Sequence, residues 1–192
     1  RDTMEIALTA SETGHVVYST LHTISAGQTI NRILGMFNKE EEQQIRERLT
    51  GSLRYIVSQR LVPKTSGGRL LITELMGSSL RSREAIALGE SDSRRFSDII
   101  ESAQSVGWHS FEQSLVKAFE EDLITEETAM LYCTNKPQMH QRLDSAKKRQ
   151  ETSRGTGGLK MRIEEPPLKP KFVPRPPPPP VLPPTMPGGS TS

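Results

Sequence analysis

The segment Thr9–Thr23, with the sequence TASETGHVVYSTLHT, constrains the fold of this chain more than any other part. Thr13-Gly14 is expected to end a preceding helix, because glycine adopts backbone conformations that other residues avoid. His15–Leu21 is rich in β-branched and aromatic residues, which is typical of a buried strand. The pattern therefore predicts a helix, a tight turn and a strand.

Polar side chains gather at the carboxyl end of this predicted strand, where Thr20, His22 and Thr23 stand. In an open α/β sheet, ligands bind at the carboxyl ends of the strands. We therefore interpret these three residues as candidates for phosphate contact, with the hydroxyl groups of the threonines orienting His22. His15, at the start of the strand, is a further candidate, and its alternative role is a structural one in the Gly14 turn.

The region that follows predicts helices and a second strand. Ser25 is a suitable N-cap for a helix with an apolar stripe. Lys39–Val62 has apolar residues at three- and four-residue steps and predicts one long amphipathic helix, ended by Pro63. Arg69–Met76 predicts a strand that begins after a Gly-Gly turn. Two strands with helices between them indicate a layered α/β sheet.

From Ser79 onward the pattern is helical, and this predicts three parts: residues 1–78 with the sheet, a helical subdomain at 79–144, and a disordered tail at 145–192. Thr125 is expected to cap one of the helices of the subdomain. In the tail, 12 of the 14 prolines fall between Pro166 and Pro187. Such a tract cannot fill a core and favours extended polyproline II conformations.

Composition excludes several classes of protein. The chain has 25 basic and 23 acidic residues, for a net charge of +2, and only 5% aromatic residues, so neither nucleic acid nor an anionic membrane is an expected partner. Its apolar runs are too short for insertion into a bilayer. The single cysteine, Cys133, excludes an internal disulfide and a cysteine-based zinc site, and no metal site is expected.

The chain resembles the PilT-type secretion ATPases, the motors of type IV pilus retraction, which have a RecA-like P-loop core. The resemblance is carried by these segments, in this order: Asp2-Thr3, Thr13–Thr23, Ser25-Ala26, Ile30–Ile33, Ser58–Val62, Gly67–Arg69 and Leu123–Ala129. It implies that His22 lies near the terminal phosphate of ATP and helps to sense it. It also implies Mg²⁺ as the partner of the nucleotide, a homo-hexameric ring, and an inner-membrane platform protein of the pilus machine as the partner at the cytoplasmic face.

The chain departs from that family in two respects. It has no GxxxxGK[ST] loop, which in this family cradles the phosphates, and it begins at Arg1, where the resemblance implies a preceding strand with the catalytic glutamate. We therefore expect the carboxyl half of a longer protein that does not hydrolyse ATP alone. Ring ATPases use arginines from a neighbouring subunit, but the resemblance places those outside this chain. Arg46 and Arg48 are interpreted as solvent-facing.

Two features bear on the branch of the superfamily. Assembly and secretion ATPases commonly carry a four-cysteine metal module after the segment that matches Gln59–Val62, and its absence here favours the retraction branch. Ser79–Ile86 stands in the place of the AIRNLIRE motif, which is tied to retraction, but keeps only part of its character. The alternatives are a pilus assembly or type II secretion ATPase, or a non-catalytic protein that joins and modulates a ring.

Overall fold

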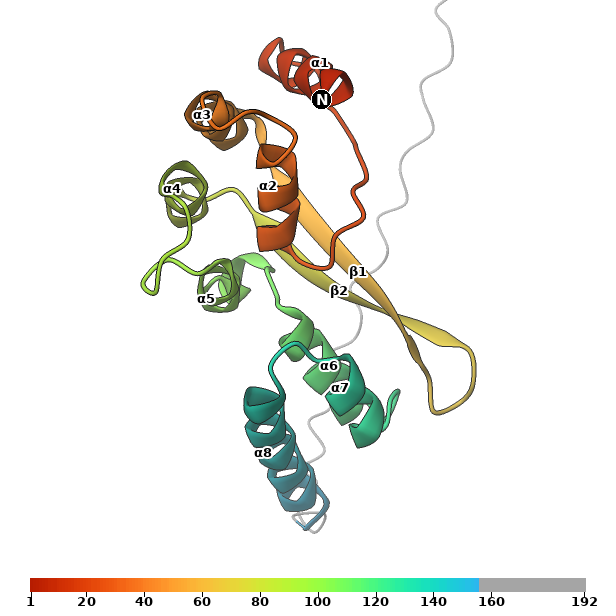
Figure 1. Ribbon diagram of the computed structural model, residues 1–192. Helices are drawn as coiled ribbons and strands as arrows, with labels where there is room; N and C mark the ends of the chain where they lie inside the picture. Colours follow the sequence, from red (N-terminus) through yellow and green to blue (C-terminus); the bar gives the residue numbers. More distant parts are fainter. Residues whose placement is uncertain (156–192) are drawn as a thin grey trace, which may run out of the picture. The chain divides into compact units, whose positions relative to one another are not determined.

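The computed structural model describes residues 1–155, with side chains described through residue 152. Three helices precede the sheet: α1 (Asp2–Glu12), α2 (Ala26–Leu34) and α3 (Glu42–Ser52) (Figure 1). The predicted N-cap of α2 is confirmed, because the Ser25 hydroxyl accepts a hydrogen bond from the Gln28 N–H at 3.3 Å. The apolar stripe of α2 is confirmed as well, since Ile30 and Ile33 are buried.

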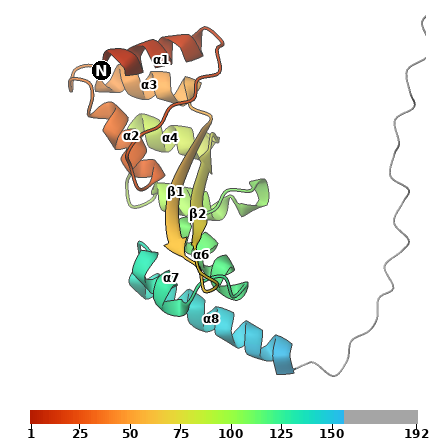
Figure 2. The same ribbon diagram turned by 90° about the vertical axis from the view of Figure 1, so that its right-hand side faces the viewer.

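The sheet is an antiparallel hairpin of β1 (Tyr55–Pro63) and β2 (Arg69–Gly77), in which Ser58 pairs with Glu74 and Leu61 with Leu71. β2 confirms the predicted strand. Helices lie on one face of the hairpin, and burial alternates along β1 accordingly (Figure 2). Side chains of the helix-covered face include Ile56, Val62 and Ile72, which are buried; Tyr55, Val57, Leu61 and Leu71, on the other face, are at least half exposed.

The long helix predicted at Lys39–Val62 is wrong. The helix ends at Ser52, just after Gly51, and the second half of the segment is β1. The apolar steps that indicated a helix come from both faces of a strand, because Ile56 faces the helices while Val57 faces away. Nine residues of β1 pair with nine of β2, and this non-local ladder decides the structure of the segment.

The strand predicted at His15–Leu21 is also wrong for the part of the chain that the structure describes. The segment has an extended course without strand pairing, and Val16 and Tyr18 are 80% and 93% exposed. A strand requires a neighbour for its backbone N–H and C=O groups. The described sheet has only two strands, and both are those of the hairpin. The predicted layered sheet is therefore reduced here to a hairpin covered by helices.

The rest of the described chain is helical: α4 (Leu80–Leu88), α5 (Phe96–Ser102), the 3₁₀ turn η1 (Gln104–Val106), α6 (Phe111–Glu120), α7 (Glu126–Tyr132) and α8 (Lys136–Gly155). Local capping explains several of their bounds. Gly89 ends α4 with a φ of 82°, and Thr125 caps α7 by accepting from the Thr128 N–H, as predicted. Ser110 begins α6 with a reciprocal capping box to Gln113.

Two hydrophobic clusters share the hairpin. The first contains residues of α1 to α5 and the Ile56 and Met76 end of the hairpin. The second contains residues of α6, α7 and α8 and the Val62 and Ile72 end. Figures 1 and 2 show the two groups of helices at opposite ends of the strands. The helices through α5 thus pack in the first cluster and those from α6 onward pack in the second. The sequence pattern instead predicted a boundary between the ATPase part and the helical subdomain after residue 78.

Order extends past Asp144, where the tail was predicted to begin. α8 continues to Gly155; Ala146 is fully buried in the second cluster, and Lys147 pairs with Glu126 at 2.6 Å. The prediction failed because this stretch is almost entirely polar in sequence, and the burial of its one apolar residue, Ala146, depends on the tertiary structure. The proline-rich tract at residues 166–187 lies outside the described residues.

Candidate functional site

His22 stands at the centre of a tight turn in the segment between α1 and α2. The Thr23 N–H donates to the Leu21 carbonyl oxygen at 3.0 Å, an i to i+2 bond that closes a three-residue turn with His22 at its apex. The His22 and Thr20 side chains are exposed. Within residues 1–152, neither side chain has a hydrogen-bond partner in the structure, so both retain their polar atoms for a ligand.

Thr23 holds this turn against α2. Its hydroxyl lies 2.7 Å from that of Thr29, and the Thr29 hydroxyl donates its single hydrogen to the Ser25 carbonyl oxygen at 2.9 Å. The Thr23 hydroxyl must therefore donate to Thr29. This geometry ties Thr23 to the first turns of α2, and the single hydrogen of its hydroxyl is used in the bond to Thr29.

Two backbone N–H groups at the N-terminus of α2 are bonded to side chains of the protein. Ser25 takes the Gln28 N–H, and the buried Glu74 carboxylate of β2 accepts from the Ala26 N–H at 2.9 Å. The Ser58 hydroxyl also donates to Glu74 at 3.3 Å. Burial raises the pKa of the Glu74 carboxyl above its usual value, and the two hydrogen bonds oppose this shift. The amides of Ala26 and Gln28 are thus not open to an anion.

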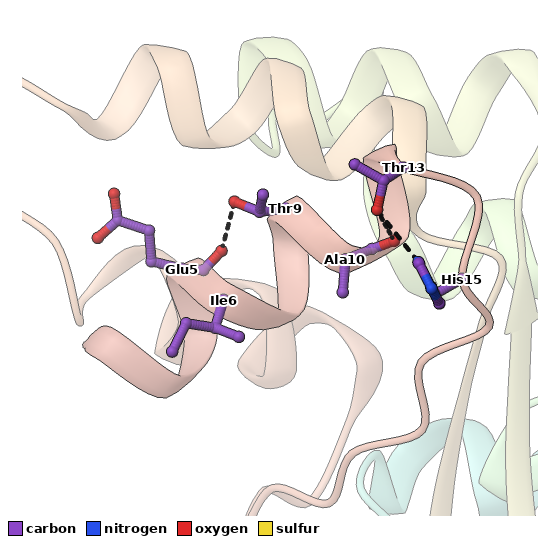
Figure 3. A pocket seen from close by; sticks show the side chains of 6 residues that line it. All are labelled: Glu5, Ile6, Thr9, Ala10, Thr13 and His15. Carbon is purple, nitrogen blue, oxygen red and sulfur yellow. Dashed lines mark hydrogen bonds between the residues drawn. The ribbon is translucent and has the colours of Figure 1, made fainter.

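His15 lies apart from this turn, at the end of α1. Its backbone N–H donates to the Ala10 carbonyl oxygen at 3.0 Å, and its Nδ1 lies 3.1 Å from the Thr13 hydroxyl (Figure 3). The Thr13 hydroxyl donates to the Ala10 carbonyl oxygen, so Nδ1 must carry the hydrogen that bonds to Thr13. His15 therefore stabilises the end of α1 and the Gly14 turn, where φ is 92°.

An open, mainly apolar pocket of about 370 Å³ lies beside His15 (Figure 3). Its lining residues are Glu5, Ile6, Thr9, Ala10, Thr13 and His15. All of them belong to α1 or its end, so the pocket does not include His22. The structure therefore separates the four predicted site residues: Thr20, His22 and Thr23 lie together just before α2, and His15 lies against the end of α1.

Arginines that the sequence placed in solvent make specific contacts. Arg46 bonds to Glu42 at 2.7 Å and to the Ile86 carbonyl oxygen of α4 at 2.7 Å. Arg48 pairs with Glu12 at 2.6 Å and so links α3 to the end of α1. The interpretation of both as solvent-facing is wrong. Glu42 lies one helical turn from Arg46, whereas Ile86 and Glu12 belong to other helices. Helical periodicity alone does not reveal contacts with other helices.

The place of the AIRNLIRE motif is the start of α4. Ser79 caps this helix through a capping box with Ser82, and the Ser82 hydroxyl also donates to the Gly77 carbonyl oxygen at 3.1 Å. Arg83 donates to the Ser78 hydroxyl at 2.8 Å, and Glu84 lies 3.5 Å from Arg94. The contacts of Ser79, Ser82 and Arg83 stabilise the passage from β2 into α4, and the Glu84–Arg94 pair joins α4 to the segment before α5.

The described residues contain no group of three or more histidine, cysteine or acidic side chains placed to hold a metal ion. None of the helices in the part of the chain that the structure describes is long and apolar enough to cross a membrane.

Comparison with known families decides the relationship. The family model for type II/IV secretion system proteins matches residues 1–162, which is most of the chain. The chain belongs to the type II/IV secretion system protein family. The matched residues include the turn at His22, the hairpin and all the described helices.

Curated relatives in the family include two pilus proteins. The type IV pilus retraction ATPase PilT of Pseudomonas aeruginosa is 36% identical over 128 residues, which are 67% of this chain and 37% of the relative. A twitching motility protein of Neisseria gonorrhoeae is 32% identical over 139 residues, which are 72% of this chain and 37% of the relative. The chain thus spans just over a third of the length of these relatives.

A solved structure of the family agrees with the fold. The crystal structure of the pilus retraction motor PilT with bound ADP is 35% identical in sequence, with a TM-score of 0.62. The likeness covers 73% of this chain and 38% of that chain. The predicted resemblance to PilT-like secretion ATPases is confirmed.

Proposed function

We propose that the chain forms part of an ATP-driven motor of the type IV pilus, with retraction and twitching motility as its output. The observation that carries the proposal is the match of most of the chain to the family, together with 36% identity to a retraction ATPase. A RecA-like ATPase core, of which these residues supply the carboxyl-terminal part, fits the mixed helix and hairpin structure and its likeness to an ADP-bound motor. The chain by itself is expected to be inactive as an ATPase.

His22 is the residue of this chain that we assign to the nucleotide. Its exposed imidazole at the apex of a tight turn fits a donor to a phosphate oxygen, and the exposed Thr20 hydroxyl lies two residues away. Thr23 positions the turn through Thr29, and His15 supports the end of α1. ATP with Mg²⁺ would be held mainly by residues outside this chain.

The parts of the motor are assigned by the same proposal. Residues 1–78 belong to the ATPase domain, and the helices that follow, through the end of α8, form a subdomain that moves as the nucleotide site opens and closes. The working assembly is a homo-hexamer at the cytoplasmic face of the inner membrane, where it acts on a platform protein of the pilus machine.

The test uses protein expressed from the native gene that contains this sequence. We expect ATP turnover, and His22→Ala should lower it by about one to two orders of magnitude, because a hydrogen bond to a charged group contributes about 1.5–3 kcal/mol. His140→Ala, in the exposed surface of α8, is the matched control and should turn over normally.

Two results would overturn parts of the proposal. Normal turnover in His22→Ala would exclude the phosphate-sensing role of His22. No turnover in the native protein would favour a non-catalytic component that joins a ring of other ATPases. Turnover by the 192-residue chain alone would contradict the expectation that it is inactive.

A further inference from the structure

Arg60 joins two parts of the chain that are far apart in sequence. From β1, its guanidinium donates to the Tyr132 carbonyl oxygen at 2.6 Å and, at 3.3 Å each, to the Ile24 carbonyl oxygen and the Thr134 hydroxyl. The same group lies 3.9 Å from the centroid of the Phe111 ring. Its planar, forked donors suit simultaneous contact with several acceptors, and stacking on the ring fixes its orientation.

One of these parts is the segment that carries His22. Ile24 follows His22 by two residues, and Arg60 holds its carbonyl oxygen. Two residues further on, Glu74 holds the Ala26 N–H. The segment between His22 and α2 is therefore fastened at two backbone positions, and both fastening side chains come from the helix-covered face of the hairpin.

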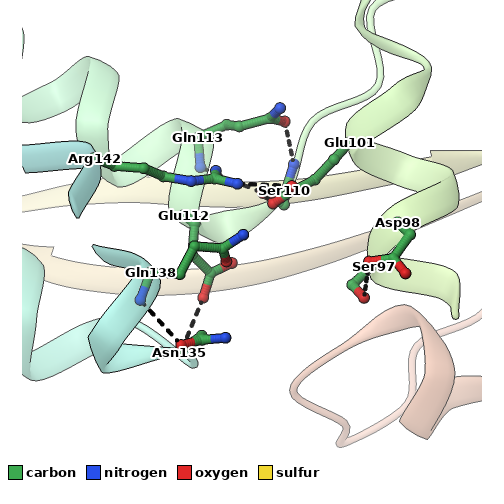
Figure 4. Close-up of polar contacts among 9 residues, drawn as sticks. All are labelled: Ser97, Asp98, Glu101, Ser110, Glu112, Gln113, Asn135, Gln138 and Arg142. Carbon is green, nitrogen blue, oxygen red and sulfur yellow. Dashed lines mark hydrogen bonds and ion pairs between the residues drawn. The ribbon is translucent and has the colours of Figure 1, made fainter. Parts of the chain in front are cut away.

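The other part is the connection between α7 and α8. Tyr132 is the last residue of α7, where a cation meets the negative end of the helix dipole. On the far side of the connection, the buried Glu112 carboxylate accepts from the Thr134 N–H at 2.8 Å and from the Asn135 N–H at 3.3 Å, and Figure 4 shows the second of these bonds. The connection is thus held between the arginine of the hairpin and the carboxylate of α6.

We propose that Arg60 is a positioning residue that couples the turn at His22 to the α7–α8 connection. Displacement of the turn moves the Ile24 carbonyl oxygen, and the shared guanidinium transmits this change to Tyr132 and Thr134. The assignment of the nucleotide as the source of the displacement depends on the proposed function. The mechanical link between the two segments is independent of it.

The link is tested first by amide hydrogen exchange on the 192-residue chain. Arg60→Lys keeps the charge but loses the fork, and we expect roughly tenfold faster exchange both near Ala26 and near Thr134, with α3 unchanged. Arg54→Lys, which replaces an exposed arginine just before β1, should change neither segment. Faster exchange in one segment only, or in the whole chain, would overturn the link.

A milder variant guards against a general loss of structure. Thr134→Val removes one exposed hydroxyl that shares a guanidinium nitrogen with Ile24. If the two segments are coupled, exchange near Ala26 should rise by about a factor of two to five. Unchanged exchange near Ala26 would show that Arg60 contacts the two segments without coupling them.

The nucleotide is then added to protein expressed from the native gene. In the wild type, ADP should slow exchange both at residues 20–26 and at residues 132–135. In Arg60→Lys, ADP should still slow exchange at residues 20–26 but no longer at residues 132–135. The affinity of this variant for ADP should stay within about twofold of the wild-type affinity. Equal responses at 132–135 in both proteins would overturn the coupling. Absence of ADP binding would instead count against the proposed function, and exchange in the chain without nucleotide would still decide the mechanical link.

Discussion

The Glu74 carboxylate accepts a hydrogen bond from the backbone N–H of Ala26 at 2.9 Å across 48 residues of sequence. Burial raises the pKa of this carboxyl, the Glu112 charge raises it further, and its hydrogen bonds and Arg60 lower it. At pH values between the pKa of Glu74 in the unfolded chain and its raised pKa in the folded protein, the folded state binds more protons than the unfolded state. The contribution of Glu74 to stability is therefore fully present below the unfolded pKa and is lost as the pH rises through the folded pKa.

The first prediction concerns Glu74→Gln, which keeps an acceptor for Ala26 but cannot ionise. Its free energy of unfolding relative to the wild type should improve as the pH rises from about 4 to about 7. Urea titrations of both proteins across this range measure the difference, with the exposed Glu40→Gln as a control for lost charge. A difference that does not vary with pH would contradict the prediction.

The second prediction concerns Gly77, where β2 passes beneath Trp108. A Cβ atom at this position would lie 2.7 Å from Nε1 of the indole, which is closer than packing allows. Gly77→Ala should cost about 1–3 kcal/mol of stability. Gly51→Ala is the control: its Cβ would meet nothing within 4 Å, and alanine in α3 should stabilise by about 0.5–1 kcal/mol. Denaturant titrations should give opposite signs for the two variants.

The third prediction compares two capping serines. Ser79 and Ser110 both form capping boxes, but the Ser110 hydroxyl also donates to Glu101 at 3.0 Å, and Glu101 pairs with Arg142 of α8 (Figure 4). Ser79→Ala should cost about 1 kcal/mol, as typical caps do. Ser110→Ala should cost about 2 kcal/mol, because a partly buried bond to a carboxylate is lost as well. Equal losses in the free energy of unfolding would exclude an added contribution of Glu101.

The fourth prediction uses neighbouring residues on opposite faces of β2. Ile72 is 3% exposed within the second cluster, whereas Leu71 is 50% exposed. Ile72→Ala should cost about 2–5 kcal/mol in this chain. Leu71→Ala should cost less than about 1 kcal/mol. Thermal denaturation should rank the variants in this order, and the reverse order would show that the outer face of the hairpin is covered in solution.

Features that depend on neighbouring residues could be predicted from the sequence. The caps at Ser25 and Thr125 and the break at Gly89 are local, because each acts on a backbone group within a few residues. β1 escaped prediction because its inward side includes the polar Ser58 and Arg60 while its outward side includes the apolar Val57 and Leu61. The alternation that identifies a strand was therefore hidden, and the remaining apolar steps imitated a helix.

The candidate site was predictable only where the resemblance covered it. The sequence pointed to His22, but the role of Thr23 depends on Thr29 and the bridge made by Arg60 depends on acceptors 36 and 72 residues away. The composition of His15–Leu21 favours a strand, but no propensity supplies the partner that a strand needs. Pairing across such separations is a property of the tertiary structure.

The hairpin belongs to both hydrophobic clusters, with Ile56 and Met76 at one end and Val62 and Ile72 at the other. Melting of either cluster would leave half of the same two strands without cover, while their ladder remains continuous between the ends. The described residues are thus expected to denature as one cooperative unit, with a calorimetric enthalpy equal to the van't Hoff enthalpy. Helices of the two ends would lose their structure at a common temperature, although they do not share a core.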